Sequence, residues 1–493
     1  MSEQQVYDAI VIGAGYAGLG QGAQFVQDGV ENFLILEKSD QIGGVWRDNT
    51  YPGAACDTQS VIYCYSYFLN IGVSRMYAGG VELLGYLQAL AKEFGLEQNI
   101  RLNQHVVSTV WIEGESHWKV STAAGETYFT RVLIPAWGQL GTPSIPNFQG
   151  LESFKGKAFH SAQWDHTVDL KGLKVGSIGA AASAVQYVPE VAKVAGQLSV
   201  FQRSANYILP RNQKIFSEAE LAEFASNPDS YRELRQSIHD EREAGFERTR
   251  RATDAAAEGM AAARAHLEEQ IQDPALREKF TPDYDFGCKR ILRADEFYPA
   301  FNRDNVELVT EGIERVTENG IITKDGVEHE LDVIIFGTGF KSQAFQGSTD
   351  IIGSNGRTLD ERWGNAPEAY LGMTVDGFPN LFILYGPNTN LNHHSIVAML
   401  EAQNKYVRQA VEYIRDSENK VLEVSAEKLQ QFNVEIQNEL QNSAFSSECS
   451  SWYKNEDGKV INNWAGTVAE YHHLTETLDV EDFQGVRQSV AAK

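Results

Sequence analysis

The sequence predicts an α/β fold with two Rossmann-like dinucleotide-binding domains and a helical insertion. Two segments, around residues 7–37 and 173–203, each show an apolar strand, a turn of small residues, a helical stretch and a second apolar strand. A third segment, 214–280, is rich in alanine and charge and has almost no strand formers, which favours helices. The 493 residues leave room for two or three domains and a sizeable core.

The charge of the chain limits its partners. The formal net charge is −25, and 42% of the residues are apolar. Nucleic acid and anionic membrane surfaces would repel such a chain, so we expect neither as a partner. The first apolar run, residues 9–26, is uncharged, but five glycines and two glutamines interrupt it. We therefore expect a strand and a turn there, in a soluble protein, and no membrane span.

The cysteines and the N-terminus bear on the compartment. Cys56, Cys64, Cys288 and Cys449 form no C-x-x-C pair, so we expect no disulfide framework, no cysteine metal site and a reducing cytoplasm. No basic residue precedes the first apolar run, which argues against a signal peptide. No bound metal is expected elsewhere either, and the oligomeric state is left open.

The first nucleotide motif combines three features in register. Gly13, Gly15 and Gly18 follow an apolar strand, and Glu37 ends a second strand, at 33–37, 19 residues after Gly18. Glycines let the backbone approach a pyrophosphate, the helix N-terminus stabilises its charge, and a carboxylate accepts hydrogen bonds from ribose hydroxyls. An acid at this place suits the adenosine of FAD.

The second motif repeats the spacing with a different final residue. Gly179 lies 24 residues before Arg203, as Gly13 lies 24 residues before Glu37. A guanidinium suits the 2′-phosphate of NADPH, so the sequence predicts FAD in the first site and NADPH in the second. Ala181 and Ala184 stand where glycine is usual, and the methyl of Ala181 could weaken NADPH binding. Arg203 could instead be a solvated charge at a strand end.

Two further apolar strands end in glycine turns, at 132–138 and 332–340. In a protein that binds two nucleotides, these strands are where the chain leaves and re-enters the FAD domain. The expected FAD domain is discontinuous and consists of residues 1–145 and 335–493. The expected NADP domain consists of 146–213 and 281–334, and the helical insertion of 214–280.

Three segments resemble the type I Baeyer–Villiger monooxygenases, and the resemblance runs from about residue 5 to 470. Phe154, Gly156, His160, Trp164 and Asp165 match every fixed position of the fingerprint F-x-G-x-x-x-H-x-x-x-W-P/D. The place of His160 between the two nucleotide motifs suggests that it couples the domains and does not act in the chemistry.

The second segment is similar to the family signature G-G-x-W, followed by Y-P-G and an aspartate. It starts at Gly43 and ends at Asp57, with Arg47 and Asp48 where the family often has two aromatics. The resemblance implies that Trp46 lines the flavin and that Asp57 contacts nicotinamide and the active-site arginine. Asp57 could otherwise be a carboxylate in a turn.

The third segment contains Lys289 and Arg290. The resemblance implies that Lys289 joins Arg203 at the 2′-phosphate and that Arg290 reaches the flavin face. Without the resemblance, Lys289 and Arg290 would be an ordinary solvated pair of charges. It also implies that residues 377–390 return to the FAD domain and that Trp452 lies near NADP. Further cofactor contacts are expected at Gly44, Val45, Trp46, Asp57, Tyr63, Val107, Ala180, Ser183, Gln186 and Ser204.

The resemblance implies a reaction as well. NADPH would reduce FAD, and O2 would give a flavin 4a-peroxide that converts a ketone into an ester or lactone. Arg290 would stabilise the peroxide as an anion, and Asp57 would hold the guanidinium. The alternatives are a flavin monooxygenase that oxidises sulfur or nitrogen, and a redox sensor or oxidase that binds both nucleotides without oxygenating. The expected partners are O2 and a small ketone or sulfide, and the sequence does not indicate which ketone.

Overall fold

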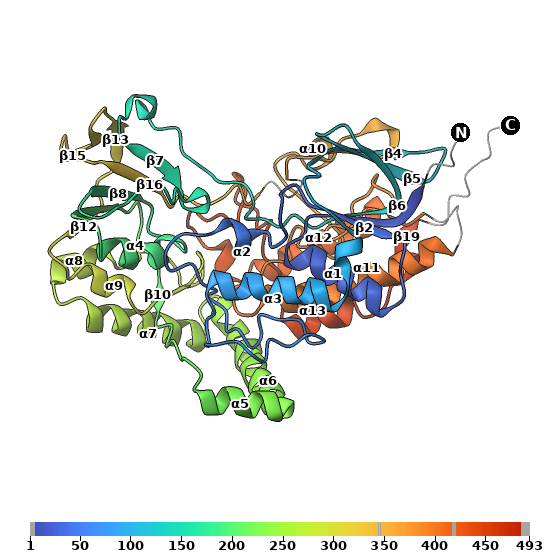
Figure 1. Cartoon of the computed structure of the whole chain (residues 1–493), viewed down its shortest axis with the longest axis horizontal. Coiled ribbons are helices and arrows are strands. Elements are labelled where there is room, and N and C mark those ends of the chain that lie inside the picture. Colours follow the sequence, from blue (N-terminus) through green and yellow to red (C-terminus); the bar gives the residue numbers. More distant parts are fainter. Residues whose placement is uncertain (1–4, 344, 346, 417–420, 485–493) are drawn as a thin grey trace.

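The computed structural model describes residues 5–343, 345, 347–416 and 421–484, and these form two α/β lobes with a helical insertion (Figure 1). The first lobe is built on a seven-stranded sheet in the order β17-β4-β5-β6-β1-β2-β3. Its strands are β1 (Val6–Ile12), β2 (Phe33–Leu36), β3 (Ile100–Arg101), β4 (Val106–Ile112), β5 (His117–Thr122), β6 (Thr127–Pro135) and β17 (Asp350–Ile352).

The centre of this sheet is parallel and fully covered. β1 pairs in parallel with β2 and β6, and Ala9, Ile10 and Val11 have no exposed surface. A parallel strand covered on both faces is apolar throughout, which is why the run is continuous and does not alternate. The main covering helices are α1 (Tyr16–Gln27), α3 (Gly80–Glu93), α11 (Ile396–Arg415), α12 (Ala426–Leu440) and α13 (Val468–Leu474). Shorter elements of this lobe are α2 (Val45–Asp48), α10 (Leu359–Trp363), β18 (Glu423–Val424) and β19 (Phe483–Gln484).

The second lobe holds a five-stranded parallel sheet in the order β12-β9-β8-β16-β7. The strands are β7 (Lys157–His160), β8 (Lys174–Ile178), β9 (Gln197–Phe201), β12 (Val306–Val309) and β16 (Val333–Phe336), with α4 (Ala184–Ala192) and α9 (Phe297–Ala300) packed beside them. An antiparallel sheet of β13 (Ile313–Val316), β14 (Gly320–Thr323) and β15 (Glu328–Glu330) and a pair of short parallel strands, β10 (Ile208–Leu209) and β11 (Leu292–Arg293), complete it. The α/β fold with two Rossmann-like domains is thereby confirmed.

The expected helical segment folds as four helices, α5 (Glu218–Ser226), α6 (Pro228–Ala244), α7 (Asp254–Gln270) and α8 (Pro274–Lys279). The Ser217 side chain and Glu220 cap the start of α5 reciprocally, and Pro228 opens α6, where the missing N–H costs nothing. Figure 1 shows α5 and α6 projecting below α3 of the first lobe.

The expectation of unpaired cysteines is wrong. Cys288 and Cys449 form a disulfide with a Cα–Cα distance of 6.4 Å, across 161 residues of sequence. Spacing gave no signal because the fold, and not a local motif, brings the segment before Lys289 against the loop at 447–467, here called the C-terminal loop. Cys56 and Cys64 are buried free thiols.

Over the described residues, no helix combines the length and apolarity needed to cross a bilayer. Within the same ranges, no group of three or more histidine, cysteine or acidic side chains is arranged to hold a metal ion.

Candidate active site

The first turn leaves an open surface between two glycines. Gly13 has φ 108°, and a Cβ there would lie 2.9 Å from the carbonyl oxygen of Ala136, so packing requires glycine. The nearest atom to a Cβ on Gly15 would be the Cα of Gly44, at 3.7 Å. The two backbones therefore face each other without side chains between them. This is the approach that a pyrophosphate needs, so the turn fits FAD.

Glu37 is held rigidly at the end of β2. It is 4% exposed, and its Oε2 accepts from the backbone N–H of Ala14 at 2.8 Å. Oε1 accepts from the backbone N–H of Ser39 at 3.0 Å and from Arg47 Nη1 at 3.1 Å. The carboxylate thus stands at the turn where a ribose would lie. The pairing of Arg47 with Glu37 was not foreseen, although Arg47 was noted as a departure from the family pattern.

Aromatic rings pack beside the start of α2. Gly44 precedes this helix, which begins with Val45 and Trp46. The ring centroids of Trp46 and Tyr63 are 5.8 Å apart in a T-shaped contact, and Tyr16 packs on Tyr63 at 4.9 Å. These rings form a rigid apolar wall of the kind that lines a flavin. Val107 stands apart from them, half-buried near the start of β4.

The second turn follows β8 with the same geometry as the first. Gly179 has φ 107°, and a Cβ there would lie 2.3 Å from the carbonyl oxygen of Gly337. Ala180 and Ala184 are buried, Ser183 precedes α4, and Ala181 is exposed. The methyl of Ala181 therefore lies on the open side of the turn, and its effect on NADPH binding stays a prediction.

Gln186 joins the two lobes. Its Oε1 accepts from Tyr51 Oη at 2.9 Å and from the backbone N–H of Ala55 at 3.2 Å, and its Nε2 donates to the carbonyl of Ala55 at 2.9 Å. These bonds hold the loop that carries Asp57 against α4. Burial raises the pKa of Tyr51 to about 12, so its hydroxyl stays a donor. The amide of Gln186, expected at a cofactor, thus binds protein atoms here.

A cluster of cations lies at the end of β9. Lys289 Nζ donates to Ser204 Oγ at 2.8 Å and lies 4.4 Å from the centroid of the Tyr284 ring. Burial and then the nearby charge of Arg203 lower the pKa of Lys289. Like charges repel here, and an anion bound between them would relieve the repulsion. The exposed Arg203 with Lys289 and Ser204 therefore fits the 2′-phosphate of NADPH.

Arg290 and Asp57 meet from different lobes. Arg290 precedes β11, whose pairing with β10 fixes its place, and Asp57 follows the loop bound by Gln186. Arg290 Nη2 lies 2.5 Å from Asp57 Oδ2, with side-chain exposures of 36% and 22%. The charge of Asp57 raises the pKa of Arg290 despite the desolvation that opposes it. The guanidinium is thus a permanent cation, partly open to bound molecules.

Two tyrosines that sequence reasoning missed, the half-buried Tyr385 and the buried Tyr453, lie in the electrostatic surroundings of Arg290. Tyr385 and Tyr453 both influence its pKa, and burial raises the pKa of each phenol above its ordinary value. Tyr385 has φ 60°, a strained backbone for a residue with a side chain and one found at functional sites. Its place before a glycine and a proline in residues 385–387 was the available signal.

Trp452 lies half-buried in the C-terminal loop, with its ring centroid 4.8 Å from that of Tyr453. The Cys288–Cys449 disulfide links this loop to the segment that carries Lys289 and Arg290. The C-terminal loop is therefore fixed beside the Arg290–Asp57 pair.

His160 fixes the segment that follows β16. The backbone N–H of Ala162 donates to its Nδ1 at 3.1 Å, so the ring proton is on Nε2, which donates to the carbonyl of Gly339 at 2.9 Å. Burial lowers the pKa of His160, which keeps this tautomer neutral. The contacts of His160 support a role in joining the end of β7 to the segment after β16.

The chain is similar over nearly its whole length to known monooxygenases. The family model for flavin-binding monooxygenase-like proteins matches residues 7–219. A Baeyer–Villiger monooxygenase of Pseudomonas aeruginosa is 39% identical over 98% of this chain and 92% of its own. A steroid monooxygenase solved with NADP has a TM-score of 0.85 and 33% identity, covering 96% of this chain and 97% of its own. A structure titled OTEMO, in complex with FAD and NADP, has a TM-score of 0.86 and 27% identity, covering 96% and 98%.

Proposed function

The chain belongs to the Baeyer–Villiger monooxygenases, which depend on FAD and NADPH, and from this premise we propose that its substrate is a ketone, which it converts into an ester or lactone. The observation that carries the proposal is the 2.5 Å contact between Arg290 and Asp57. It places a permanent cation where the two lobes meet. We place the reaction in the cytoplasm, where NADPH is regenerated; the cysteines no longer support this, since two of them are paired.

Each cofactor has a site of its own in this proposal. Gly13, Gly15 and Glu37 would hold the pyrophosphate and adenosine of FAD. The turn after β8 would hold NADPH, with Arg203 and Lys289 at its 2′-phosphate. When bound, NADPH supplies two electrons and the reduced flavin activates O2. The protein then has to orient the ketone, exclude water and stabilise charge.

Arg290 would stabilise the negative charge that develops on oxygen. An oxygen that attacks a carbonyl as a nucleophile must carry this charge, and the carbonyl oxygen receives it as the new bond forms. A guanidinium does not titrate away at physiological pH, and its planar donors can serve two acceptors. Fixed in advance by Asp57, it needs no reorganisation during the reaction.

Asp57 is a positioning partner in this scheme. Its Oδ2 accepts from Arg290, and the loop before it is fixed by Gln186 and by the bond from the Cys56 N–H to the carbonyl of Ala78 at 2.9 Å. Oxidation of a sulfide would not need this arrangement, because there the oxygen is transferred as an electrophile. The arrangement of Arg290 held by Asp57 therefore favours a ketone as the substrate.

The test is a comparison of ketones with sulfides under labelled oxygen. Purified enzyme with FAD and NADPH would be given cyclic, linear, aryl and steroidal ketones and matched aryl sulfides in 18O2. We expect esters or lactones with one labelled oxygen per NADPH consumed, and slower sulfoxide formation. Sulfoxides formed efficiently with no ester from any ketone would overturn the ketone assignment.

A further inference from the structure

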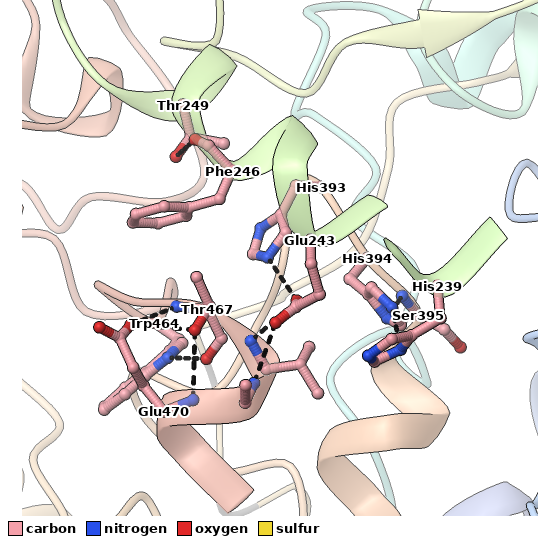
Figure 2. Close-up of polar contacts among 12 residues, drawn as sticks. His239, Glu243, Phe246, Thr249, His393, His394, Ser395, Trp464, Thr467 and Glu470 are labelled. Atoms are coloured by element: carbon pink, nitrogen blue, oxygen red, sulfur yellow. Dashed lines mark hydrogen bonds and ion pairs between the residues drawn. The ribbon is translucent and has the colours of Figure 1, made fainter. Parts of the chain in front are cut away.

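Helix α6 of the insertion contacts two segments near the Arg290–Asp57 pair, one at Gln59 and one at residues 393–395. Arg242 and Glu243 lie three and four residues after His239, on the same side of the helix. Figure 2 shows His239 and Glu243 directed toward His394 and His393. Arg242 Nε donates to Gln59 Oε1 at 2.7 Å, two residues beyond Asp57. His239 and Glu243 instead face residues 393–395, just before α11. One helix thus contacts both segments.

Glu243 anchors this face to α13. Its Oε1 accepts from the backbone N–H of Val468 and its Oε2 from that of Ala469, both at 3.1 Å, and Oε1 lies 3.7 Å from His393 Nε2 (Figure 2). Burial alone would raise the pKa of Glu243, but the nearby His393 ring and the bonds from the two amides lower it to about 2. The carboxylate therefore stays charged, and α6 stays docked.

The hydrogen bond between His239 and His394 has a defined donor and acceptor. The backbone N–H of Ser395 donates to His394 Nδ1 at 2.7 Å, so the proton of this ring is on Nε2. Nε2 lies 2.9 Å from His239 Nδ1, which must therefore accept. Burial, and then the repulsion that a proton on His394 would meet from protonated His239 or His393, lower the pKa of His394 to about 3, so the ring is neutral. His239 thus selects the orientation of His394.

The segment held by His394 leads directly to the active site. Asn390 Oδ1 accepts from Tyr385 Oη at 2.6 Å, and Asn392 Oδ1 lies 3.4 Å from Tyr453 Oη. Both tyrosines belong to the surroundings of Arg290. Residues 390–395 therefore lie between α6 on one side and the Arg290–Asp57 pair on the other.

We propose that His239 is a positioning residue for the ketone reaction, because by accepting the Nε2 proton of His394 it holds residues 390–395 in place beside the Arg290–Asp57 pair. This inference rests on the proposed function. His239 lies on the insertion, outside both nucleotide motifs, and acts through His394. A displacement of about 1 Å in a segment that positions the substrate can cost roughly a hundredfold in rate.

Two substitutions separate the hydrogen bond from the bulk of the ring. In His239→Asn, the side-chain oxygen stands near the place of Nδ1 and can still accept from His394. In His239→Phe, the ring remains but cannot accept. We expect His239→Phe to lower kcat/KM for the ketone about 10- to 100-fold and to divert NADPH to hydrogen peroxide. His239→Asn should stay within about threefold of the wild type, as should Ser237→Ala on the exposed side of α6.

A second measurement needs no ketone. Hydrogen exchange of the flavin-loaded enzyme should be faster at residues 390–400 in His239→Phe and unchanged in His239→Asn. Flavin reduction by NADPH should be the same in all variants. Wild-type kcat/KM in His239→Phe, or equal loss in both variants, would overturn the proposal. An enzyme that formed only sulfoxides would instead disprove the ketone assignment, while the exchange result would still decide the role of His239.

Discussion

We expect Arg203, just past the end of β9, to determine which nicotinamide cofactor is preferred. Arg203 lies near Lys289, and burial and then the charge of Arg203 lower the pKa of Lys289. Removal of one charge-assisted contact of ~1.5–3 kcal/mol should raise the KM for NADPH roughly 10- to 150-fold in Arg203→Ala. The KM for NADH should change little, since NADH has no 2′-phosphate. Steady-state kinetics with both cofactors tests this, and an unchanged preference would reassign Arg203 as a solvated charge.

A single histidine should make the fold sensitive to acid. The pKa of His394 is about 3 in the folded protein against an ordinary value of 6.5, so the unfolded chain binds the extra proton first. Its contribution to stability is therefore complete above about pH 6.5 and is lost as the pH falls toward 3. Between pH 7 and 5 this amounts to about 2 kcal/mol of unfolding free energy.

The substitution His394→Asn should remove that part of the pH dependence. Urea unfolding at pH 7 and pH 5 should show a smaller loss for the variant than for the wild type by about 2 kcal/mol. His473, whose side chain is 85% exposed, provides the control, and His473→Asn should behave as the wild type does. Equal losses in all three proteins would show that His394 can accept a proton without cost.

Residue types at fixed spacings were predictable, but their partners were not. The spacing from Gly18 to Glu37 placed the carboxylate at the first turn, and the structure has it there, bonded to the Ala14 N–H. The bond from Arg47 to Glu37 depends on how α2 turns after Gly44. The bonds of Gln186 depend on a loop 131 residues earlier in the chain. Contacts of this kind follow from packing between elements.

At the scale of elements, the disulfide is the least expected feature. It ties the segment before β11 to the C-terminal loop and closes 161 residues of chain. Such a cross-link restricts the unfolded chain and typically contributes about 2–4 kcal/mol. We expect Cys449→Ser to lower the unfolding free energy by about that amount.

A reductant provides the matched control for this prediction. Treatment with a phosphine should destabilise the wild type to the level of Cys449→Ser and leave the variant unchanged. Mass spectrometry under non-reducing conditions should detect the peptide pair that contains Cys288 and Cys449. Free thiols at both positions in the purified native protein would contradict the bond.

The elements themselves followed from local patterns wherever those patterns were long. β1, α1 and β2 appear where the first motif predicted them, and 214–280 contains four helices. The short strands β10 and β11 have no periodicity to detect, yet their pairing fixes the place of Arg290. The direction in which α6 presents His239 and Glu243 was equally invisible, because it depends on α13 and on residues 393–395.

At the scale of the whole molecule, the family and the fold were predictable because motifs are spread along the chain. The first and second turns each define a lobe, and the two sheets confirm them. What could not be foreseen is how the lobes meet. Gln186, the Cys288–Cys449 bond and α6 each join segments more than 100 residues apart. The active site lies among these contacts, so its geometry required the structure.

The central claim is that Arg290, held by Asp57, is the cation on which ester formation depends. Removal of a preorganised group of this kind typically costs ~2.7–4 kcal/mol, or about 10²–10³ in rate. In Arg290→Ala the FAD site is untouched, so flavin should bind and NADPH should still be consumed. Arg290→Lys should recover little, because an ammonium lacks the planar pair of donors. Arg293→Ala, whose guanidinium instead donates to the carbonyl of Pro210, serves as the control.

The most direct measurement is the yield of labelled ester per NADPH consumed by Arg290→Ala in 18O2, with hydrogen peroxide determined in the same reaction. The account predicts a fall in the rate of ester formation of about a hundredfold or more, with hydrogen peroxide in place of the ester, while Arg293→Ala keeps the wild-type yield. Ester formation by Arg290→Ala at nearly the wild-type rate and yield would contradict it, and would make Arg290 a solvated charge beside Asp57.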